Sequence, residues 1–308
     1  MTTPPLSRRQ ILSLGAALGL LTSCGTGNGG EVRTRLGLAT GPEGAVYREI
    51  GHAIADLVHR ERPDIGIDIR YTDAAWENIL LMDEGEVDLM LANIDVAQTE
   101  ETPAKALGRL FESIFHVIVP KSAEIDGLED LDGRVIACGQ PLSGTRYMAQ
   151  VIFEDAGIAP TIRDFSQTAS MEELARGEVD AVVSLTGMPM PALLNAEDRE
   201  QYTLLPLGRT VDDVVRTRPM HYLPVDIPAS MYPGLGSART LAVPTLLLAD
   251  PALDEELAAD LTGLIFENTR ELSQAHPGAG SINDRTGSAT VPIPLHPGAE
   301  RWFREHKL

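Results

Sequence analysis

Two stretches of the chain repeat the same short pattern. Residues 82–92 read MDEGEVDLMLA and residues 174–184 read LARGEVDAVVS, so each contains Gly-Glu-Val-Asp followed by an apolar run. A glycine after a helical segment typically takes the left-handed conformation that ends the helix, which we expect of Gly85 and Gly177. A short apolar run after such a turn is typical of a strand buried inside a parallel sheet. The repeat therefore predicts a helix followed by a central strand at two places in the chain.

A second pair of similar segments lies upstream of this repeat. Arg35–Ala39 and Arg134–Cys138 have strand composition, and each leads into a glycine-bearing loop that opens a helix. The apolar face of the first of these helices consists of Val46, Ile50, Ala53, Ile54, Leu57 and Val58. Residues 65–71 and 161–165 supply a middle strand in each half of the chain. Strands that alternate with helices predict parallel sheets with right-handed crossovers, so the fold class is α/β with two lobes.

The chain is expected to pass between the two lobes twice. A bridging strand at Phe115–Val119 leaves the first lobe, and Thr240–Ala249 returns to it. After the return we predict one long amphipathic helix over residues 252–275 and a final helix over residues 297–306. The two crossings would form a hinge. The predicted boundaries are residues 33–118 and 241–308 for lobe 1 and residues 119–240 for lobe 2.

The first 23 residues have the features of a bacterial export signal. Paired arginines at positions 8 and 9 precede an apolar run at residues 11–21, which is shorter than the roughly 20 residues of a membrane-spanning helix. The arginines fit a twin-arginine signal. Leu-Thr-Ser-Cys resembles the lipobox of bacterial lipoproteins, so Cys24 is the predicted lipid anchor. An ordinary secretory signal with a chance cysteine is the alternative. Residues 24–32 would be a flexible tether. The export signal and the lipid on Cys24 together predict a location on the extracytoplasmic face of the cell membrane.

The composition of the chain limits its partners. The chain has 45 acidic and 25 basic residues, for a formal charge of −20 at pH 7. Nucleic acids and anionic lipids bind through clusters of Lys and Arg, so neither is an expected partner. The two cysteines, Cys24 and Cys138, have no second Cys or His at metal-ligand spacing. No structural metal is therefore expected.

The ligand site of an open parallel sheet lies beyond the carboxyl ends of its strands. The loops at residues 40–47 and 139–146 open helices there and place backbone N–H groups at helix N-termini, which bind anions. We interpret two such ends that face each other across a cleft as a site for a small carboxylate. Each loop taken alone also fits ordinary helix capping and turn formation. Arg146 can either pair with the carboxylate or project into solvent.

Several segments resemble, in order, the TAXI-type solute receptors of tripartite (TRAP) transporters. The matching stretches are ATGPEGAVY at 39–47, WENIL at 76–80, EGEVD at 84–88, PLSGT at 141–145, TGMP at 186–189, PASMY at 228–232 and IPLHPGA at 293–299. The resemblance runs from about residue 33 to the end of the chain. It implies a two-lobe, type II periplasmic-binding-protein fold with a ligand cleft between the lobes. It also implies a dicarboxylate, glutamate or another small organic anion as ligand, delivery to a TRAP membrane permease, and no cofactor.

The ligand-binding residues predicted from these loops and from the resemblance lie in both lobes. They are Thr40, Gly44, Ala45, Val46, Tyr47, Trp76, Asn78, Ser143, Gly144, Thr145, Arg146, Gly187 and Met188. Two stretches depart from the family pattern, because Pro42 and Glu43 stand in a loop that is usually richer in glycine and residues 72–76 read TDAAW. If Glu43, Asp73 or Glu77 faces the cleft, its charge would disfavour a doubly anionic ligand and favour a cationic or neutral one.

The predicted mechanism is hinge closure. Ligand contacts to both lobes would shift the population toward a closed form that a membrane partner recognises. A lipoprotein that reports its ligand to a membrane sensor would have the same receptor surface. An enzyme would need Cys138 as its reactive group, but no His and Asp accompany this residue at a recognisable spacing. The protein is therefore predicted not to be an enzyme.

Overall fold

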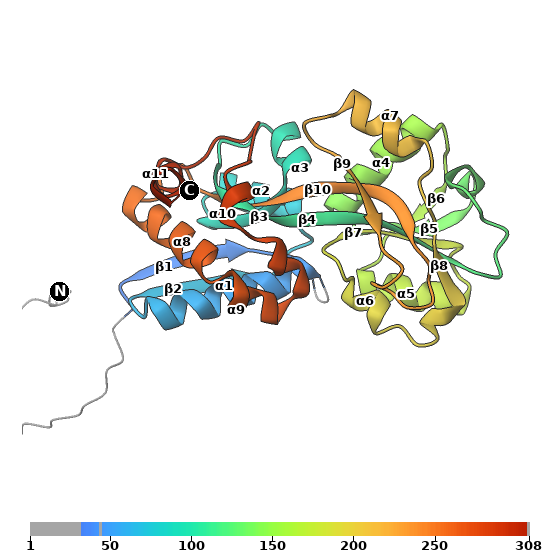
Figure 1. The fold of residues 1–308 in the computed structure, drawn as a ribbon, viewed down its shortest axis with the longest axis horizontal. Helices are drawn as coiled ribbons and strands as arrows, with labels where there is room; N and C mark the ends of the chain where they lie inside the picture. The colour runs from blue at the N-terminus through green and yellow to red at the C-terminus, as the bar shows by residue number, and fades with distance from the viewer. Residues whose placement is uncertain (1–31, 43–44, 307–308) are drawn as a thin grey trace, which may run out of the picture. The chain divides into compact units, whose positions relative to one another are not determined.

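The computed structural model describes residues 32–42 and 45–306, so the predicted signal, tether and anchor residue Cys24 lie outside the described residues, as do Glu43 and Gly44. The strands are β1 (Thr34–Ala39), β2 (Ile65–Arg70), β3 (Leu89–Asn93), β4 (Lys105–Pro120), β5 (Val135–Ala137), β6 (Thr161–Arg163), β7 (Ala181–Thr186), β8 (Tyr202–Leu204), β9 (Leu223–Ile227) and β10 (Ala238–Ala249). They form one sheet in the order β2-β1-β3-β10-β4-β7-β5-β6, with β8 paired to β4 and β9 paired to β10 (Figure 1).

Helices cover both faces of this sheet. The α-helices are α1 (Val46–Glu61), α2 (Ala75–Asp83), α3 (Ile94–Thr99), α4 (Gly144–Ala156), α5 (Gln167–Arg176), α6 (Pro191–Leu194), α7 (Thr210–Thr217), α8 (Glu255–Glu267), α9 (Thr269–Ala275), α10 (Asp284–Gly287) and α11 (Pro297–His306). Short 3₁₀ turns are η1 (Leu128–Leu131), η2 (Arg199–Gln201) and η3 (Pro277–Ser281). Within the described ranges, no helix is both long enough and apolar enough to cross a lipid bilayer.

Two groups of parallel strands match the predicted duplication. In the first half, β1 pairs in parallel with β2 and β3, and in the second half β5 pairs in parallel with β6 and β7. We call β1–β3 with α1–α3 and α8–α11 the first half, and β5–β7 with α4–α7 the second half. Gly85 and Gly177 follow α2 and α5 with φ angles of 72° and 71°, which confirms their predicted left-handed conformation. The helix, glycine and buried-strand unit thus occurs twice.

The sheet is mixed rather than parallel throughout, which differs from the expectation. β4 and β10 run antiparallel to each other, and they run antiparallel to β7 and β3. The predicted bridging strand at Phe115–Val119 is only the end of β4, which begins already at Lys105. The ion pair of Arg109 with Glu112 falls inside this strand and breaks its apolar pattern, which is why the sequence does not reveal the full strand. β4 and β10 together connect the two halves.

The predicted long helix over residues 252–275 is wrong, because the chain forms two helices there. α8 begins after Asp254, whose side chain accepts hydrogen bonds from the N–H groups of Glu256 and Leu257 at 3.0 Å. α8 ends at Asn268, whose side-chain amide donates to the carbonyl of Leu264 at 2.8 Å in competition with the helix backbone. The predicted final helix is confirmed as α11.

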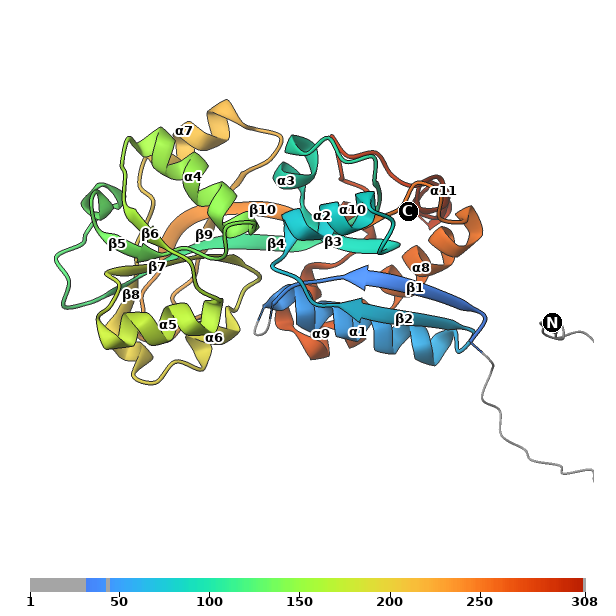
Figure 2. The same ribbon diagram turned by 180° about the vertical axis from the view of Figure 1, so that it is seen from behind.

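The hydrophobic core is continuous on one face of the sheet and divided on the other. One cluster contains Met82 of α2 and Val96 of α3 together with Met148 of α4 and Val211 of α7, so it extends across both halves. On the opposite face, the cluster around α1 and α8 and the cluster around α5 and α6 are separate. Both views show α2, α3, α4 and α7 along one edge and α1, α5, α6 and α9 along the other (Figures 1 and 2). Among the described residues, a shared hydrophobic core therefore joins the two halves on one face and not on the other.

Candidate functional site

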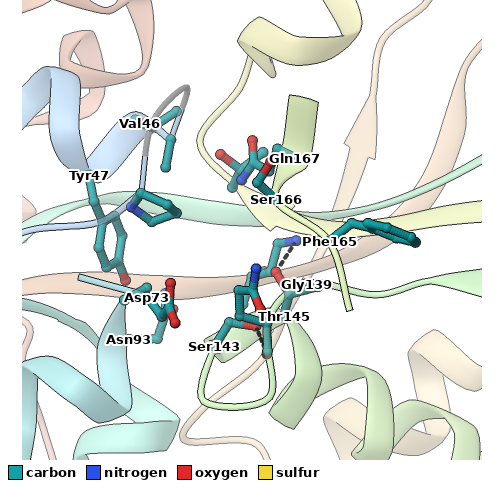
Figure 3. A pocket seen from close by; sticks show the side chains of 17 residues that line it. Val46, Tyr47, Asp73, Asn93, Gly139, Ser143, Thr145, Phe165, Ser166 and Gln167 are labelled. Carbon is teal, nitrogen blue, oxygen red and sulfur yellow. Dashed lines mark hydrogen bonds between the residues drawn. The ribbon is translucent and has the colours of Figure 1, made fainter. Parts of the chain in front are cut away.

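A cavity lies where the carboxyl ends of the parallel strands in the first half face the second half. Figure 2 shows the arrowheads of β1 and β2 pointing toward the second half. Six predicted site residues line the cavity, namely Ala45, Val46, Tyr47, Ser143, Gly144 and Thr145. Figure 3 shows Tyr47, Asp73 and Asn93 on one side of the cavity and Ser143, Thr145 and Ser166 on the other. The cavity volume is about 60 Å³.

Three helices begin at this cavity. The residues that precede α1, α4 and α5 are Ala45, Ser143 and Ser166, and all three line the cavity. The first N–H groups of a helix have no acceptor inside the helix, and the aligned peptide dipoles make that end positive. Ala45 has no side-chain oxygen that could cap α1. Backbone N–H groups of both halves therefore make the electrostatic potential in the cavity more positive.

Hydroxyl groups fix the start of α4 against the neighbouring strand. The Thr145 hydroxyl oxygen accepts a hydrogen bond from the N–H of Leu185 at 3.0 Å, which links α4 to the end of β7. The Ser143 hydroxyl accepts from the N–H of Arg146 at 3.2 Å and donates to the carbonyl of Gln140 at 2.7 Å. Both hydroxyl groups thus form hydrogen bonds with backbone groups of the protein. The α4 terminus is thus held rigidly toward the cavity.

A polar cluster lies on the first-half side of the cavity. The Asn93 amide donates to the Thr245 hydroxyl at 3.2 Å, and the Thr245 and Ser113 hydroxyls are 2.9 Å apart. Tyr47 is 8% exposed, and its hydroxyl has no hydrogen-bond partner among the described residues. Burial raises the pKa of Tyr47 far above its usual value, and the neighbouring hydroxyls of Thr245 and Ser113 oppose this shift. The Tyr47 hydroxyl therefore keeps its proton at neutral pH, and it lies near these two hydroxyls without a hydrogen bond of good geometry among the described residues.

The side chains around the cavity supply no positive charge. None of the described residues that line it is Lys, Arg or His, and the carboxylate among them belongs to Asp73. Arg146 instead pairs with Asp164, and its Nε donates to the carbonyl of Cys138 at 3.3 Å. Glu77 is not among the residues that line the cavity, and its carboxylate accepts a hydrogen bond from the Asp73 N–H at 2.6 Å. Attraction of an anion therefore depends on the helix termini.

Glycines let the two halves approach closely around the cavity. A Cβ atom on Gly187 would lie 2.8 Å from Cγ1 of Val46, and a Cβ atom on Gly144 would lie 2.7 Å from Oδ1 of Asn93. Both distances are shorter than real side chains tolerate. His276 adds a polar contact on the same side as Gly187, because its Nε2 donates to the carbonyl of Pro189 at 3.0 Å. The Val46–Gly187 and His276–Pro189 contacts lie on the face where the core is divided.

Contacts on the other face connect α2 and α3 with the second half. The Tyr222 hydroxyl donates to Oδ2 of Asp95 at 2.8 Å, and the hydroxyl oxygens of Thr99 and Tyr147 are 2.8 Å apart. The ring of Trp76 lies 5.0 Å from the ring of Tyr147, between centroids. These contacts accompany the continuous core.

The remaining predicted residues do not line the cavity. Asn78 is fully buried, and its amide donates to the carbonyls of Thr40 and Leu91. Thr40 donates through its hydroxyl to the Arg70 carbonyl. The other residues outside the lining are Trp76, Arg146, Gly187 and Met188. A ligand-binding role for these residues and for the masked Gly44 stays a prediction.

One wall of the cavity was not predicted from the sequence. Phe165, Ser166 and Gln167 follow β6 and open α5, and all three line the cavity. They obey the same rule that identified the other loops, since they lie beyond the carboxyl end of a parallel strand. The signal was present, but β6 is only three residues long and Ser166 resembles an ordinary helix cap.

Cys138 has no features of a reactive thiol. It is fully buried, and burial raises its pKa to about 12. The thiol is therefore protonated and shielded from solvent at neutral pH, which is the opposite of a nucleophilic cysteine. Among residues 32–42 and 45–306, no group of three His, Cys, Asp or Glu side chains is arranged to hold a metal ion.

We expect the buried Asp95 to give a measurable pH dependence of stability. Burial raises the pKa of Asp95 to about 6, compared with about 3.9 in an unfolded chain. The native state therefore holds this proton more tightly, so its stabilising effect is complete below about pH 4 and is lost as the pH rises through about 6, with a total near 2–3 kcal/mol. Urea unfolding of Asp95→Asn should show a stability relative to wild type that increases between pH 4.5 and 7.5.

The lost acceptor atom in Asp95→Asn adds an offset that does not depend on pH, so only the slope is diagnostic. Asp83→Asn, at the exposed end of α2, is the matched control and should follow the wild-type profile. Parallel profiles for Asp95→Asn and wild type would contradict the raised pKa.

The fold and a family model agree on the class of this protein. A model of the NMT1-like family matches residues 38–306. XAC2383 from Xanthomonas citri bound to ATP superposes with a TM-score of 0.52 at 14% identity, covering 88% of this chain and 94% of that one. A putative L-cystine ABC transporter from Listeria monocytogenes gives 0.51 at 11% identity, with coverage of 80% and 97%. The effector-binding domain of QuiR in complex with shikimate gives 0.51 at 11% identity, with coverage of 80% and 98%.

These similarities show the fold, which is the mixed α/β, two-lobe cleft fold of periplasmic binding proteins. The family match covers most of the chain. The protein therefore belongs to the NMT1-like family.

Proposed function

We propose that this protein is an exported solute receptor that captures a small organic anion in the cavity between its two halves. The observation that carries the proposal is the convergence of the N-termini of α1, α4 and α5 on one cavity that both halves line. Oriented backbone N–H groups bind anions without a basic side chain. Structures of the same fold include proteins described with ATP and with shikimate, which is support by analogy.

The proposed mechanism is closure about a hinge formed by β4 and β10. Both strands cross between the halves, and the shared core holds one face together while the opposite face is divided. Opening would separate Val46 from Gly187 and expose the cavity at the divided face. A micromolar ligand requires about 8 kcal/mol, which several hydrogen bonds in a dry cleft can supply. The proposed lobes are residues 33–118 with 241–308, and residues 119–240.

We further propose that the receptor is held at the membrane by a lipid on Cys24 after export through a twin-arginine signal. It would deliver its ligand to a TRAP-type permease, as the TAXI resemblance implies. A permease gene beside this one would support delivery, whereas a histidine-kinase gene would favour a sensor role. Metabolic labelling with radioactive palmitate should mark the wild-type protein and leave Cys24→Ala unlabelled. Equal labelling of the two would contradict the anchor.

Thermal-shift titration tests the receptor function directly. The full chain is titrated with three- to five-carbon monocarboxylates and dicarboxylates, glutamate, and neutral and cationic solutes. We expect concentration-dependent stabilisation by at least one small anion, because a ligand that binds only the native state raises its stability. Stabilisation by cationic or neutral solutes alone would contradict an anion receptor. No stabilisation by any solute would contradict the receptor function itself.

We expect Thr145→Val to weaken anion binding by roughly fivefold to tenfold and to lower stability by about 1–3 kcal/mol, since the buried N–H of Leu185 loses its acceptor. Valine has nearly the same shape, so the change removes mainly the hydroxyl. Thr168→Val, at an exposed position of α5, is the matched control and should behave as wild type. Unchanged affinity in Thr145→Val would mean that the start of α4 does not position the ligand.

A further inference from the structure

We propose that the preferred ligand is a small 2-oxo or 2-hydroxy monocarboxylate rather than a dicarboxylate or an amino acid. The inference rests on the proposed receptor function and narrows its ligand class. Four features of the cavity carry it: the balance of charge, the position of Asp73, the unpaired hydroxyl of Tyr47 and the size of the cavity.

The balance of charge fits one carboxylate. Each helix N-terminus is equivalent to roughly half a positive charge, so the three termini together offer about 1.5 charges. No basic side chain among the described lining residues adds to this, and Asp73 subtracts from it. Asp73 leaves a surplus of about half a positive charge, which partly neutralises a single carboxylate and leaves a second one without a counter-charge. Arg146, which a dicarboxylate would need, is already paired with Asp164.

Asp73 opposes a second negative group directly. It precedes α2 on the first-half side of the cavity, where Figure 3 shows it beside Asn93 and Tyr47. A ligand whose carboxylate lies on the helix termini extends its other end toward these residues. A second carboxylate there would be repelled, whereas a neutral carbonyl or hydroxyl group would not.

The Tyr47 hydroxyl needs an acceptor from the ligand. It is buried, protonated and without a partner among the described residues, so in a dry cavity it carries the cost of an unmade hydrogen bond. The oxygen at the second carbon of pyruvate or lactate can accept this proton. The ammonium group at the same position in an amino acid would be attracted by Asp73, but it only donates, so it would leave the Tyr47 hydroxyl proton unpaired.

The size and walls of the cavity fit a ligand of three or four carbons. A volume of about 60 Å³ has room for a molecule of the size of pyruvate or lactate. Val46 and Leu185 add apolar walls to the cavity.

Titration calorimetry of the full chain with pyruvate, lactate, propionate, alanine, succinate and glutamate tests the inference. We expect pyruvate or lactate to bind at least about tenfold more tightly than the other four. Propionate lacks only the oxygen at the second carbon, so its deficit measures the contact with Tyr47. A site built to hydrogen-bond such an oxygen rejects an analogue that lacks it.

Two variants separate the contributions. Tyr47→Phe should lower the affinity for pyruvate by about tenfold and leave propionate unchanged, with Tyr71→Phe, an exposed tyrosine outside the cavity, as the matched control. Asp73→Asn should raise the affinity for succinate severalfold, with the exposed Asp83→Asn as its control. Equal losses for pyruvate and propionate in Tyr47→Phe would overturn the assigned role of the hydroxyl.

The outcomes distinguish this inference from the receptor proposal. If succinate, glutamate or alanine binds most tightly, the monocarboxylate inference is overturned while the receptor function stands. If none of the six compounds binds, and no solute of the wider thermal-shift panel stabilises the protein, the monocarboxylate inference and the receptor function are both overturned.

Discussion

Replacing Gly187 with alanine is expected to weaken ligand binding strongly while leaving the unliganded fold intact. The new methyl group would lie 2.8 Å from Cγ1 and 3.1 Å from Cγ2 of Val46 when the halves are closed. Val46 is β-branched, 1% exposed and part of α1, so it has little freedom to move away. An overpacked contact of this kind costs about 2 kcal/mol, which corresponds to roughly a 30-fold loss of affinity.

The open form escapes this cost, because Gly187 and Val46 belong to different halves of the molecule. Gly187→Ala should therefore unfold at the same urea concentration as wild type when no ligand is present. The matched rescue is the double variant Gly187→Ala with Val46→Ala, which restores the missing space. Affinity lost in the single variant should largely return in the double variant. An unchanged affinity in Gly187→Ala would contradict closure at this contact.

Asn78→Ala is expected to produce the largest loss of stability. The Asn78 amide donates to the carbonyls of Thr40 at 2.8 Å and Leu91 at 2.7 Å, and its oxygen accepts from the Thr72 hydroxyl at 2.6 Å. Alanine leaves these buried groups unpaired and creates a small cavity, for a total of about 3 kcal/mol in the free energy of unfolding. Urea denaturation without ligand measures this loss.

The exposed Asn195 provides the control, and Asn195→Ala should change the free energy of unfolding by less than about 0.5 kcal/mol. The two interpretations of Asn78 then separate cleanly. A structural residue loses stability first, and any affinity loss follows from the disturbed ends of β1 and β3. If Asn78→Ala keeps full stability and binds ligand poorly, Asn78 is a ligand contact after all.

The alternation of strands and helices was readable in the sequence because each unit carries its own local signals. Gly85 and Gly177 have the positive φ angles expected after a helix, and the apolar face of α1 is buried as its spacing predicts. What the sequence does not encode locally is strand direction. β4 and β10 pair across more than a hundred residues, and this pairing decides that the sheet is mixed.

The break between α8 and α9 could not be predicted from the sequence either. The apolar spacing of residues 252–275 continues in phase from α8 into α9, so the periodicity alone predicts one helix. The interruption depends on the side chain of Asn268, which reaches back to the Leu264 carbonyl. Polar residues at such a position are common inside helices, and only the observed hydrogen bond distinguishes a break from a continuation.

At the candidate site, the sequence located the loops better than the side chains. The N-termini of α1 and α4 line the cavity as the two-helix interpretation requires, and α5 adds a third. The direction of Arg146 was open, and the structure places its guanidinium against Asp164. That outcome depends on β6 lying next to β5, which brings Asp164 within reach and which a linear sequence does not show.

The most direct test of ligand-driven closure is the intrinsic fluorescence of Trp76. Its ring packs on Tyr147 of the opposite half beside the shared core, so a rotation of the halves about β4 and β10 would change the angle between the two rings without separating them. The other tryptophan of the chain, Trp302, is buried in α11. The full chain is titrated separately with pyruvate, succinate and glutamate, with Trp76→Phe as the control that assigns the signal. The account predicts a saturable change with at least one anion, which disappears in Trp76→Phe and needs a much higher ligand concentration in Gly187→Ala. A constant signal with every anion, or identical titrations of wild type and Gly187→Ala, would contradict closure of the two halves around a bound anion.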